Sequence, residues 1–168
     1  MDIYSEQDNK GRERFKQFCK RKQWCKHHKD AIKQYSHWDI AYYSGNTMIL
    51  AEIKEREYAS TAFSDWWGEM YKYNELMALK DKLKLQGKDV KVHYINLFTN
   101  DDVIIWELDN IQLDTFKMDL NATTLEDNGT RNKAMYRLWK AQSIVWEPIT
   151  IKPLLKNIDE DIDDNLPF

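Results

Sequence analysis

The sequence predicts a mixed α/β domain in which helices flank a central mixed β-sheet. Apolar residues recur with helical spacing in residues 5–21 and 65–85, whereas residues 90–98 and 103–108 are rich in Val, Ile, Tyr and Trp, which favour strands. A two-residue hairpin signal, Gly45-Asn46, lies between two apolar runs. Strands that alternate with helices and hairpins are typical of an α/β fold with a mixed sheet.

The first half of the chain predicts a helix, a weak strand and a second, longer helix. The first helix is expected over Ser5–Arg21, where Phe15, Phe18 and Cys19 form an apolar stripe. Residues 23–28 are a weaker candidate for a strand. The second helix is expected to start at a cap on Ser64 or Asp65, to run to about Leu85 and to end at Gly87. Its apolar stripe consists of Trp66, Met70, Tyr73 and Met77.

The second half predicts a hairpin, a third helix and an edge strand. The hairpin joins Val90–Phe98 to Val103–Leu108, and residues 111–120 fit no single pattern. Asn128-Gly129 indicates a turn before a helix over Thr130–Gln142, on which Arg131, Lys133, Arg137 and Lys140 would form a basic face. A strand over Ile144–Ile151 is expected at the edge of the sheet, because Pro148 cannot donate a hydrogen bond.

The Gly45-Asn46 hairpin carries the most informative polar residues. If these two residues form the loop, Ser44 faces Thr47, Asp39 faces Glu52, and Asp39, Glu52 and Lys54 lie on one face of the sheet. Opposed carboxylates repel each other, and a divalent cation bound by their oxygen atoms relieves the repulsion. The alternative is an exposed polar face with a surface Glu-Lys pair.

Asp39 followed by Glu52-Ile53-Lys54 resembles the signature of the PD-(D/E)XK nuclease superfamily, with Trp38 where the family name has proline. The resemblance covers residues 10–110 and implies a restriction-endonuclease-like core. It also implies that Asp39, Glu52 and the main-chain carbonyl of Ile53 hold Mg²⁺, for which Mn²⁺ can substitute. Lys54 would activate or orient the attacking water.

The same resemblance suggests two further catalytic residues. Nucleases similar to Holliday junction resolvases often supply a metal-side Glu from the first helix, and Glu13 is the candidate, with Glu6 in reserve. The alternative is that Glu13 pairs with neighbouring arginines. Lys72 lies where related nucleases carry a residue that faces the scissile phosphate, but a surface pair between Glu69 and Lys72 would equally explain both.

Charge is unevenly distributed along the chain. Residues 10–33 contain ten Lys or Arg and two acidic residues, although the whole chain has a net charge of -3. This basic segment is expected either to contact DNA phosphates or to be a solvated helix face. The candidate DNA-binding residues are Arg12, Arg14, Lys16, Lys20 and Arg137.

The last residues differ in composition from the rest. We expect a nuclease-like domain over residues 1–155 and an acidic, disordered tail over 156–168. The tail ends in Leu166, Pro167 and Phe168, which resembles the tip of bacterial single-stranded DNA-binding proteins and would recruit replication or repair proteins. The alternative is a solubilising tail without a partner.

The expected function is therefore a Mg²⁺-dependent DNA endonuclease acting in recombination, repair or replication, in a bacterial or phage-infected cytoplasm and with DNA as its partner. By analogy with junction resolvases it would form a homodimer. Two alternatives stay open: a non-catalytic single-stranded DNA-binding protein, and a nuclease fold that has lost its activity. No apolar run is long enough to span a membrane, and Cys19 and Cys25 form no zinc or redox motif.

Overall fold

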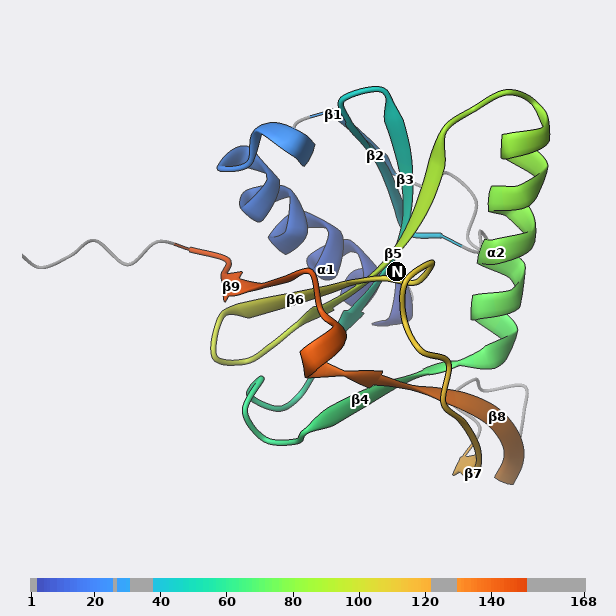
Figure 1. Ribbon diagram of the computed structural model, residues 1–168. Helices are drawn as coiled ribbons and strands as arrows, with labels where there is room; N and C mark the ends of the chain where they lie inside the picture. Colours follow the sequence, from blue (N-terminus) through green and yellow to red (C-terminus); the bar gives the residue numbers. More distant parts are fainter. Residues whose placement is uncertain (1–2, 26, 31–37, 122–129, 151–168) are drawn as a thin grey trace, which may run out of the picture.

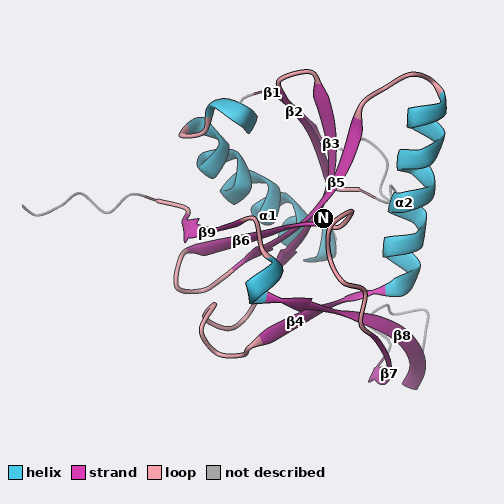
Figure 2. Cartoon of the chain, viewed as in Figure 1, coloured by secondary structure: helices cyan, strands magenta, loops and turns pink. Residues whose placement is uncertain are grey.

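The computed structural model describes residues 3–25, 27–30, 38–121 and 130–150. Within these ranges the fold is mixed α/β, as the sequence predicts (Figure 2). The elements are α1 (Ile3–Lys20), the 3-10 turn η1 (Gln23–Cys25), β1 (His27–Asp30), β2 (Ile40–Ser44), β3 (Thr47–Glu55), β4 (Asp65–Glu69), α2 (Met70–Leu85), β5 (Val90–Leu97), β6 (Asp102–Glu107), β7 (Thr115–Asn121), β8 (Thr130–Trp139), the 3-10 turn η2 (Lys140–Gln142) and β9 (Val145–Pro148).

The described strands form two sheets. The central sheet has six strands in the order β1-β2-β3-β5-β6-β9, in which only β3 and β5 run parallel to each other. The chain between these parallel strands forms β4 and α2, since a parallel pair needs a long crossover. The smaller antiparallel sheet has the order β4-β8-β7. Figure 1 shows α1 on one side of the central sheet, and α2 with the small sheet on the other.

Helix α1 covers one face of the central sheet. Phe15 and Phe18 are fully buried and pack in one cluster with Ile53 and Ile95 of the parallel strands. Gly11 allows the helix to approach closely, because a Cβ atom at this position would lie 3.2 Å from Cγ2 of Ile53. The predicted first helix is confirmed, with ends that differ by one or two residues.

The opposite face of the central sheet packs against α2 and the small sheet. Leu50 of β3 belongs to a second buried cluster with Val92, Leu76 of α2 and Leu138 of β8. Successive residues of a strand point to opposite faces. Glu52 and Lys54 therefore lie on the α2 face, and the intervening Ile53 lies on the α1 face.

The β2–β3 hairpin has the predicted loop and register. Ser44 pairs with Thr47, and Gly45 has a φ of 60°, which a turn with glycine at its first central position requires. The regular ladder ends one pair short of Asp39, however. The main-chain N–H of Asp39 donates to the carbonyl of Ala51, so Asp39 does not stand directly opposite Glu52 as the sequence predicts.

Helix α2 is shorter than the sequence predicts. It begins at Met70, because residues 65–69 form β4 and pair with β8. Gly68 allows this pairing: a Cβ atom there would lie 2.7 Å from the Tyr136 hydroxyl. The predicted end is confirmed, since Gly87 has a φ of 81° directly after the last turn.

The predicted helix over residues 130–142 is wrong. Thr130–Trp139 forms β8, and only η2 is helical. In β8 the buried Tyr136 and Leu138 alternate with the more exposed Arg137 and Trp139. Strand β4, which pairs with one edge of β8, comes from a distant part of the chain, so local spacing did not reveal this pairing.

The remaining assignments are mostly confirmed. Strands β5 and β6 form the predicted hairpin, and Pro148 ends β9 at the edge of the central sheet. Residues 111–120 contain most of β7, whereas the predicted strand over 23–28 is η1 followed by the start of β1. Within the described residues, neither helix is long and apolar enough to cross a membrane.

Two predicted features lie outside the described residues. These are the Asn128-Gly129 turn and the acidic tail over residues 156–168, with Leu166, Pro167 and Phe168. The division into a domain and a tail stays a prediction.

Candidate catalytic site

A buried carboxylate lies at the centre of the site. Glu52, in the middle of β3, is 1% exposed and stands beside Tyr94 of β5. Its Oε2 atom is buried and accepts no hydrogen bond from any described residue. Burying a charge is costly unless cations or hydrogen bonds compensate for the lost hydration. The surroundings of Glu52 therefore determine its chemistry.

Two lysines supply the compensating charge. Lys54 Nζ lies 2.7 Å from Oε1 of Glu52, and Lys72 Nζ lies 3.8 Å from Oε2. Burial opposes the charged form of Lys54, but Glu52, Tyr94 and Asp39 together raise its pKa above the ordinary value. Lys54 is thus an ammonium group at neutral pH, which suits it to stabilise negative charge rather than to accept a proton.

Asp39 lies at the open end of the β2–β3 ladder. Its Oδ2 atom accepts a hydrogen bond of 2.7 Å from the main-chain N–H of Ile53. The N–H and C=O groups of one strand residue point to the same side. The carbonyl of Ile53 therefore also points to the β2 side of β3, beyond the end of the regular pairing.

These residues fit a hard divalent cation. The donor set contains two carboxylates and a main-chain carbonyl, which are the oxygen ligands that Mg²⁺ prefers, and Oε2 of Glu52 is a buried acceptor without a hydrogen bond. Among the described residues there is no group of three or more His, Cys, Asp or Glu side chains placed to hold a metal. The two-carboxylate arrangement would leave several positions of the cation to water and substrate.

Arg56 lies on the same face of the sheet as Glu52 and Lys54, although it is not among the residues predicted for the site. Its Nε atom donates to Oδ1 of Asn96 at 3.0 Å, and Nη2 donates to the carbonyl of Trp67 at 3.0 Å and to the Tyr94 hydroxyl at 3.4 Å. The signal was present, because residues 52, 54 and 56 alternate onto one face of an extended chain. Asn96 and Tyr94 are brought to Arg56 only by the β3–β5 pairing.

Further polar atoms around this face lack hydrogen-bond partners. Nδ2 of Asn96 and the hydroxyl of Tyr136 are buried, and no described residue bonds to either. Burial raises the pKa of Tyr136 well above its ordinary value, and Tyr94 and Glu52 add to the effect. The Tyr136 side chain is therefore neutral. It belongs to β8 and lies on the side of Glu52 that faces the small sheet. Unpaired buried polar atoms are rare in native proteins, and a bound water, a bound ion or a catalytic role can account for them.

The structure separates Glu13 from this cluster. Glu13 is 68% exposed and pairs with Lys16 at 2.8 Å, one turn further along α1. Helix α1 lies on the Ile53 face of the sheet, opposite the Glu52 face. Glu6, the reserve candidate, is also exposed. Lys72, in contrast, is brought to Glu52, while Glu69 pairs with Lys133 at 3.1 Å instead of with Lys72.

The candidate DNA-binding residues differ in how many hydrogen bonds and ion pairs they make within the protein. Arg14 donates to Glu55 at 2.7 Å and to the carbonyl of Phe98 at 2.8 Å. Burial opposes the charged form of Lys16, but its ion pairs with Asp30 and Glu13 raise its pKa above the ordinary value.

Two other candidates on α1 are more accessible. Arg12 bonds only to Asn9 among the described residues, and Lys20 is exposed.

Arg137 does not belong to a helical basic face as predicted. It lies on β8, where its guanidinium group pairs with Asp65 at 2.8 Å and Asp114 at 3.3 Å and stacks 4.5 Å from the Phe116 ring centroid. The positive charge of Arg137 is therefore largely committed to contacts within the fold.

A cavity of about 550 Å³ lies beyond the carboxyl ends of β3 and β5. Lys10, Arg14 and Arg56 line it, together with Glu55, Glu57, Phe98 and Thr99. The carboxyl ends of parallel strands are a common location for ligand sites in open α/β sheets. This cavity places three cationic and two acidic groups at the end of the strand that carries Glu52 and Lys54.

No protein-family model matches the chain, and no curated protein matches it. Among solved structures, the chain is similar to Hjc, a Holliday junction resolvase from the archaeal hyperthermophile Archaeoglobus fulgidus. The sequence identity is 9% and the TM-score is 0.44, over 73% of this chain and 83% of that chain.

Proposed function

We propose that the protein is a metal-dependent DNA nuclease, and that Glu52, Lys54 and Asp39 form the active site in which it hydrolyses phosphodiester bonds. The observation that carries the proposal is the buried Glu52 carboxylate, which lies between Lys54 and Lys72 and keeps Oε2 without a hydrogen bond. Buried ion clusters are weak contributors to stability and are frequent in active sites. The resemblance of Asp39 and Glu52-Ile53-Lys54 to the PD-(D/E)XK signature supports the same reading.

Each side chain would have a distinct role. Asp39 and Glu52, with the Ile53 carbonyl, would hold Mg²⁺ or Mn²⁺. Such an ion lowers the pKa of a bound water and neutralises charge on the phosphate. Lys54, being charged, would orient the water or stabilise negative charge on the phosphate in the transition state. Lys72 would place a second positive charge beside Oε2 of Glu52, on the side that the substrate would approach.

The binding alternatives differ in how well they fit the fold. Single-stranded DNA-binding proteins of the class suggested by the tail have a five-stranded barrel. The described strands instead form an open central sheet with β1 and β9 at its edges, which removes the structural basis of that reading. A nuclease fold that binds DNA without cutting it remains the competing proposal.

A cleavage assay separates these proposals. Labelled linear duplex, single-stranded, flapped and four-way DNA are incubated with the full chain, with and without Mg²⁺. Cleavage that requires Mg²⁺ and falls at least about 100-fold in Glu52→Gln supports the nuclease assignment. The matched control is Asp81→Asn, since Asp81 is an exposed acid on α2. Binding without cleavage supports the competing proposal, and equal cleavage by wild type and Glu52→Gln contradicts the site.

The finer expectations of the sequence analysis stay predictions. These are the preferred DNA structure, the roles in recombination, repair or replication, the homodimer, and recruitment of proteins by the tail. The same set of substrates would identify the preferred DNA structure.

A further inference from the structure

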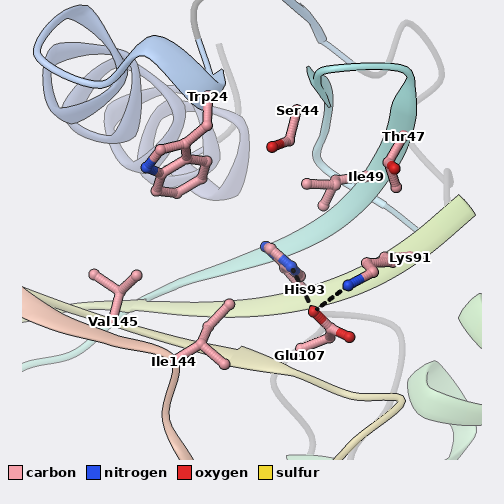
Figure 3. Close-up of a pocket in the computed structure, with 9 residues that line it drawn as sticks. All are labelled: Trp24, Ser44, Thr47, Ile49, Lys91, His93, Glu107, Ile144 and Val145. Atoms are coloured by element: carbon pink, nitrogen blue, oxygen red, sulfur yellow. Dashed lines mark hydrogen bonds and ion pairs between the residues drawn. The ribbon is translucent and has the colours of Figure 1, made fainter.

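A second polar cluster lies on the α1 face of the central sheet, away from Glu52. It lines a cavity of about 230 Å³ between η1, the β2–β3 hairpin and the start of β5 (Figure 3). His93 and Lys91 of β5 belong to the face that alternates with Tyr94, so the sheet separates this cavity from the candidate catalytic site. The proposed nuclease chemistry uses none of these residues.

The cavity has an apolar side, a polar group of side chains on β5 and β6, and the hydroxyl-bearing Ser44 and Thr47 at the β2–β3 hairpin. Trp24, Ile49, Ile144 and Val145 provide the apolar surface. The Trp24 indole is fixed by an edge contact with Phe18 and a tilted contact with Tyr42, both at 5.9 Å between ring centroids. A rigid aromatic wall of this kind suits the face of a flat ring. Apolar cavities with a few convergent polar groups are the usual form of small-ligand sites.

The polar wall is centred on Glu107. Lys91 Nζ lies 3.0 Å from Oε2 of Glu107, and His93 Nε2 lies 3.9 Å from the same oxygen (Figure 3). The other oxygen, Oε1, accepts a hydrogen bond of 2.7 Å from Asn110, which fixes the carboxylate. His93 and Glu107 are nearly buried, whereas Lys91 is 46% exposed and stands at the edge of the cavity.

The tautomer of His93 follows from its neighbours. Burial and the nearby Lys91 lower the pKa of His93 to about 4, although Asp109 opposes the shift, so the ring is neutral at pH 7. Nδ1 lies 2.5 Å from the Tyr42 hydroxyl. If Tyr42 donates this bond, Nε2 carries the proton and points toward Glu107. The other tautomer would direct a lone pair at the carboxylate, so we assign the proton to Nε2.

The wall therefore presents a donor, an acceptor and a donor in order: the Lys91 ammonium, Oε2 of Glu107 and Nε2–H of His93. The complementary ligand edge is an acceptor, a donor and an acceptor. The imide edge of uracil and thymine, C=O, N–H and C=O, has this order. Cytosine and adenine place a lone pair opposite Glu107, and guanine places an amino group opposite one of the two donors.

We propose that this cavity binds the base of a uracil or thymine nucleotide, with the ring against Trp24 and the imide edge on Lys91, Glu107 and His93. Its volume is below the range of about 300–1,000 Å³ of drug-sized pockets, which suits a single six-membered ring. The base can come from a free nucleoside or from an unpaired nucleotide in a strand, because both present the same edge.

The test measures binding of nucleosides to the full chain by calorimetry, with ¹⁵N-histidine NMR to follow His93. Uridine and thymidine are expected to bind saturably and to shift the His93 Nε2 resonance, and cytidine to bind at least about tenfold more weakly. Failure of uridine and thymidine to bind at millimolar concentration overturns the proposal, and so does cytidine binding of equal strength.

Two variants check the role of each polar group. Glu107→Gln offers an amide that can donate to cytosine, so the ratio of uridine to cytidine affinity should fall toward one. Loss of a structural contact alone would lower both affinities together, which would contradict the assignment. Lys91→Met removes a partly exposed donor and should weaken uridine binding about tenfold, whereas the exposed Lys88→Met should not.

Short oligonucleotides identify the source of the base. An oligothymidylate that binds more tightly than thymidine, with no such gain for oligocytidylate, supports recognition of an unpaired nucleotide in a strand. An oligothymidylate that fails to compete with thymidine supports a free nucleoside as the ligand.

Discussion

The Nζ atom of Lys72 lies 3.8 Å from Oε2 of Glu52, so the first turn of α2 provides a cation to a carboxylate in the middle of β3. This contact depends on the start of α2 at Met70, because the preceding residues pair as β4. If α2 began five residues earlier, as the sequence predicts, Lys72 would no longer lie in its first turn.

We expect Lys72→Met to lower the cleavage rate constant by about 100-fold, because the substitution removes a positive charge beside the proposed reacting centre. The dissociation constant for DNA should change much less, since one partly buried lysine contributes little to the total phosphate contacts. Single-turnover kinetics and binding measurements separate the two effects. The control is Lys84→Met, an exposed lysine on the same helix. Full activity in Lys72→Met would exclude Lys72 from the site.

Binding of Mg²⁺ should raise the melting temperature. A ligand that binds only the folded state raises the free energy of unfolding by RT ln(1 + [L]/Kd). The gain should be lost in Asp39→Asn and in Glu52→Gln, and retained in Asp81→Asn. Thermal unfolding followed by circular dichroism at increasing Mg²⁺ gives the result without a cleavage assay. An equal gain in all variants would mean that the ion binds elsewhere.

The basic residues of α1 should divide into two groups. Neutralising Arg12 and Lys20 together should reduce the slope of log K against log salt by about 2, if each contacts one phosphate. Arg14→Met should instead lower the free energy of unfolding by about 1–3 kcal/mol, because it breaks bonds to Glu55 and to the carbonyl of Phe98. Salt titrations of DNA binding and urea unfolding test the two halves. An unchanged salt slope in the double variant would place the DNA elsewhere.

His93 should make stability depend on pH. Its pKa is lowered from 6.5 to about 4 in the folded state by burial and then by Lys91, with Asp109 opposing; Glu107 and Tyr42 also face the ring. Between these values the unfolded chain binds a proton that the folded chain does not. The free energy of unfolding should therefore fall as pH decreases from about 6.5 to about 4, by about 3 kcal/mol in total.

The measurement compares urea unfolding of wild type and His93→Gln across this pH range. The difference between the two proteins isolates the histidine, because the other titrating groups are shared. Parallel pH profiles would show that His93 is not buried in its neutral form.

Short-range patterns in the sequence determined much of the fold. The Gly45-Asn46 loop, the end of α2 at Gly87 and the edge position of Pro148 follow from the backbone preferences of single residues, which act locally. The placement of Glu52 and Lys54 on one face follows from strand alternation alone. The sequence therefore predicted which residues form the centre of the candidate site.

Tertiary structure alone decided the surroundings of that centre. Strands β4 and β8 replaced predicted helical segments because they pair with each other although they are distant in sequence, and pairing energy overrides weak local preference. The same packing brought Lys72 to Glu52, while the side of α1 that packs on the sheet left Glu13 in solvent. Contacts such as Arg56 with Asn96 depend on which strands become neighbours, and helical or strand periodicity carries no information about that choice.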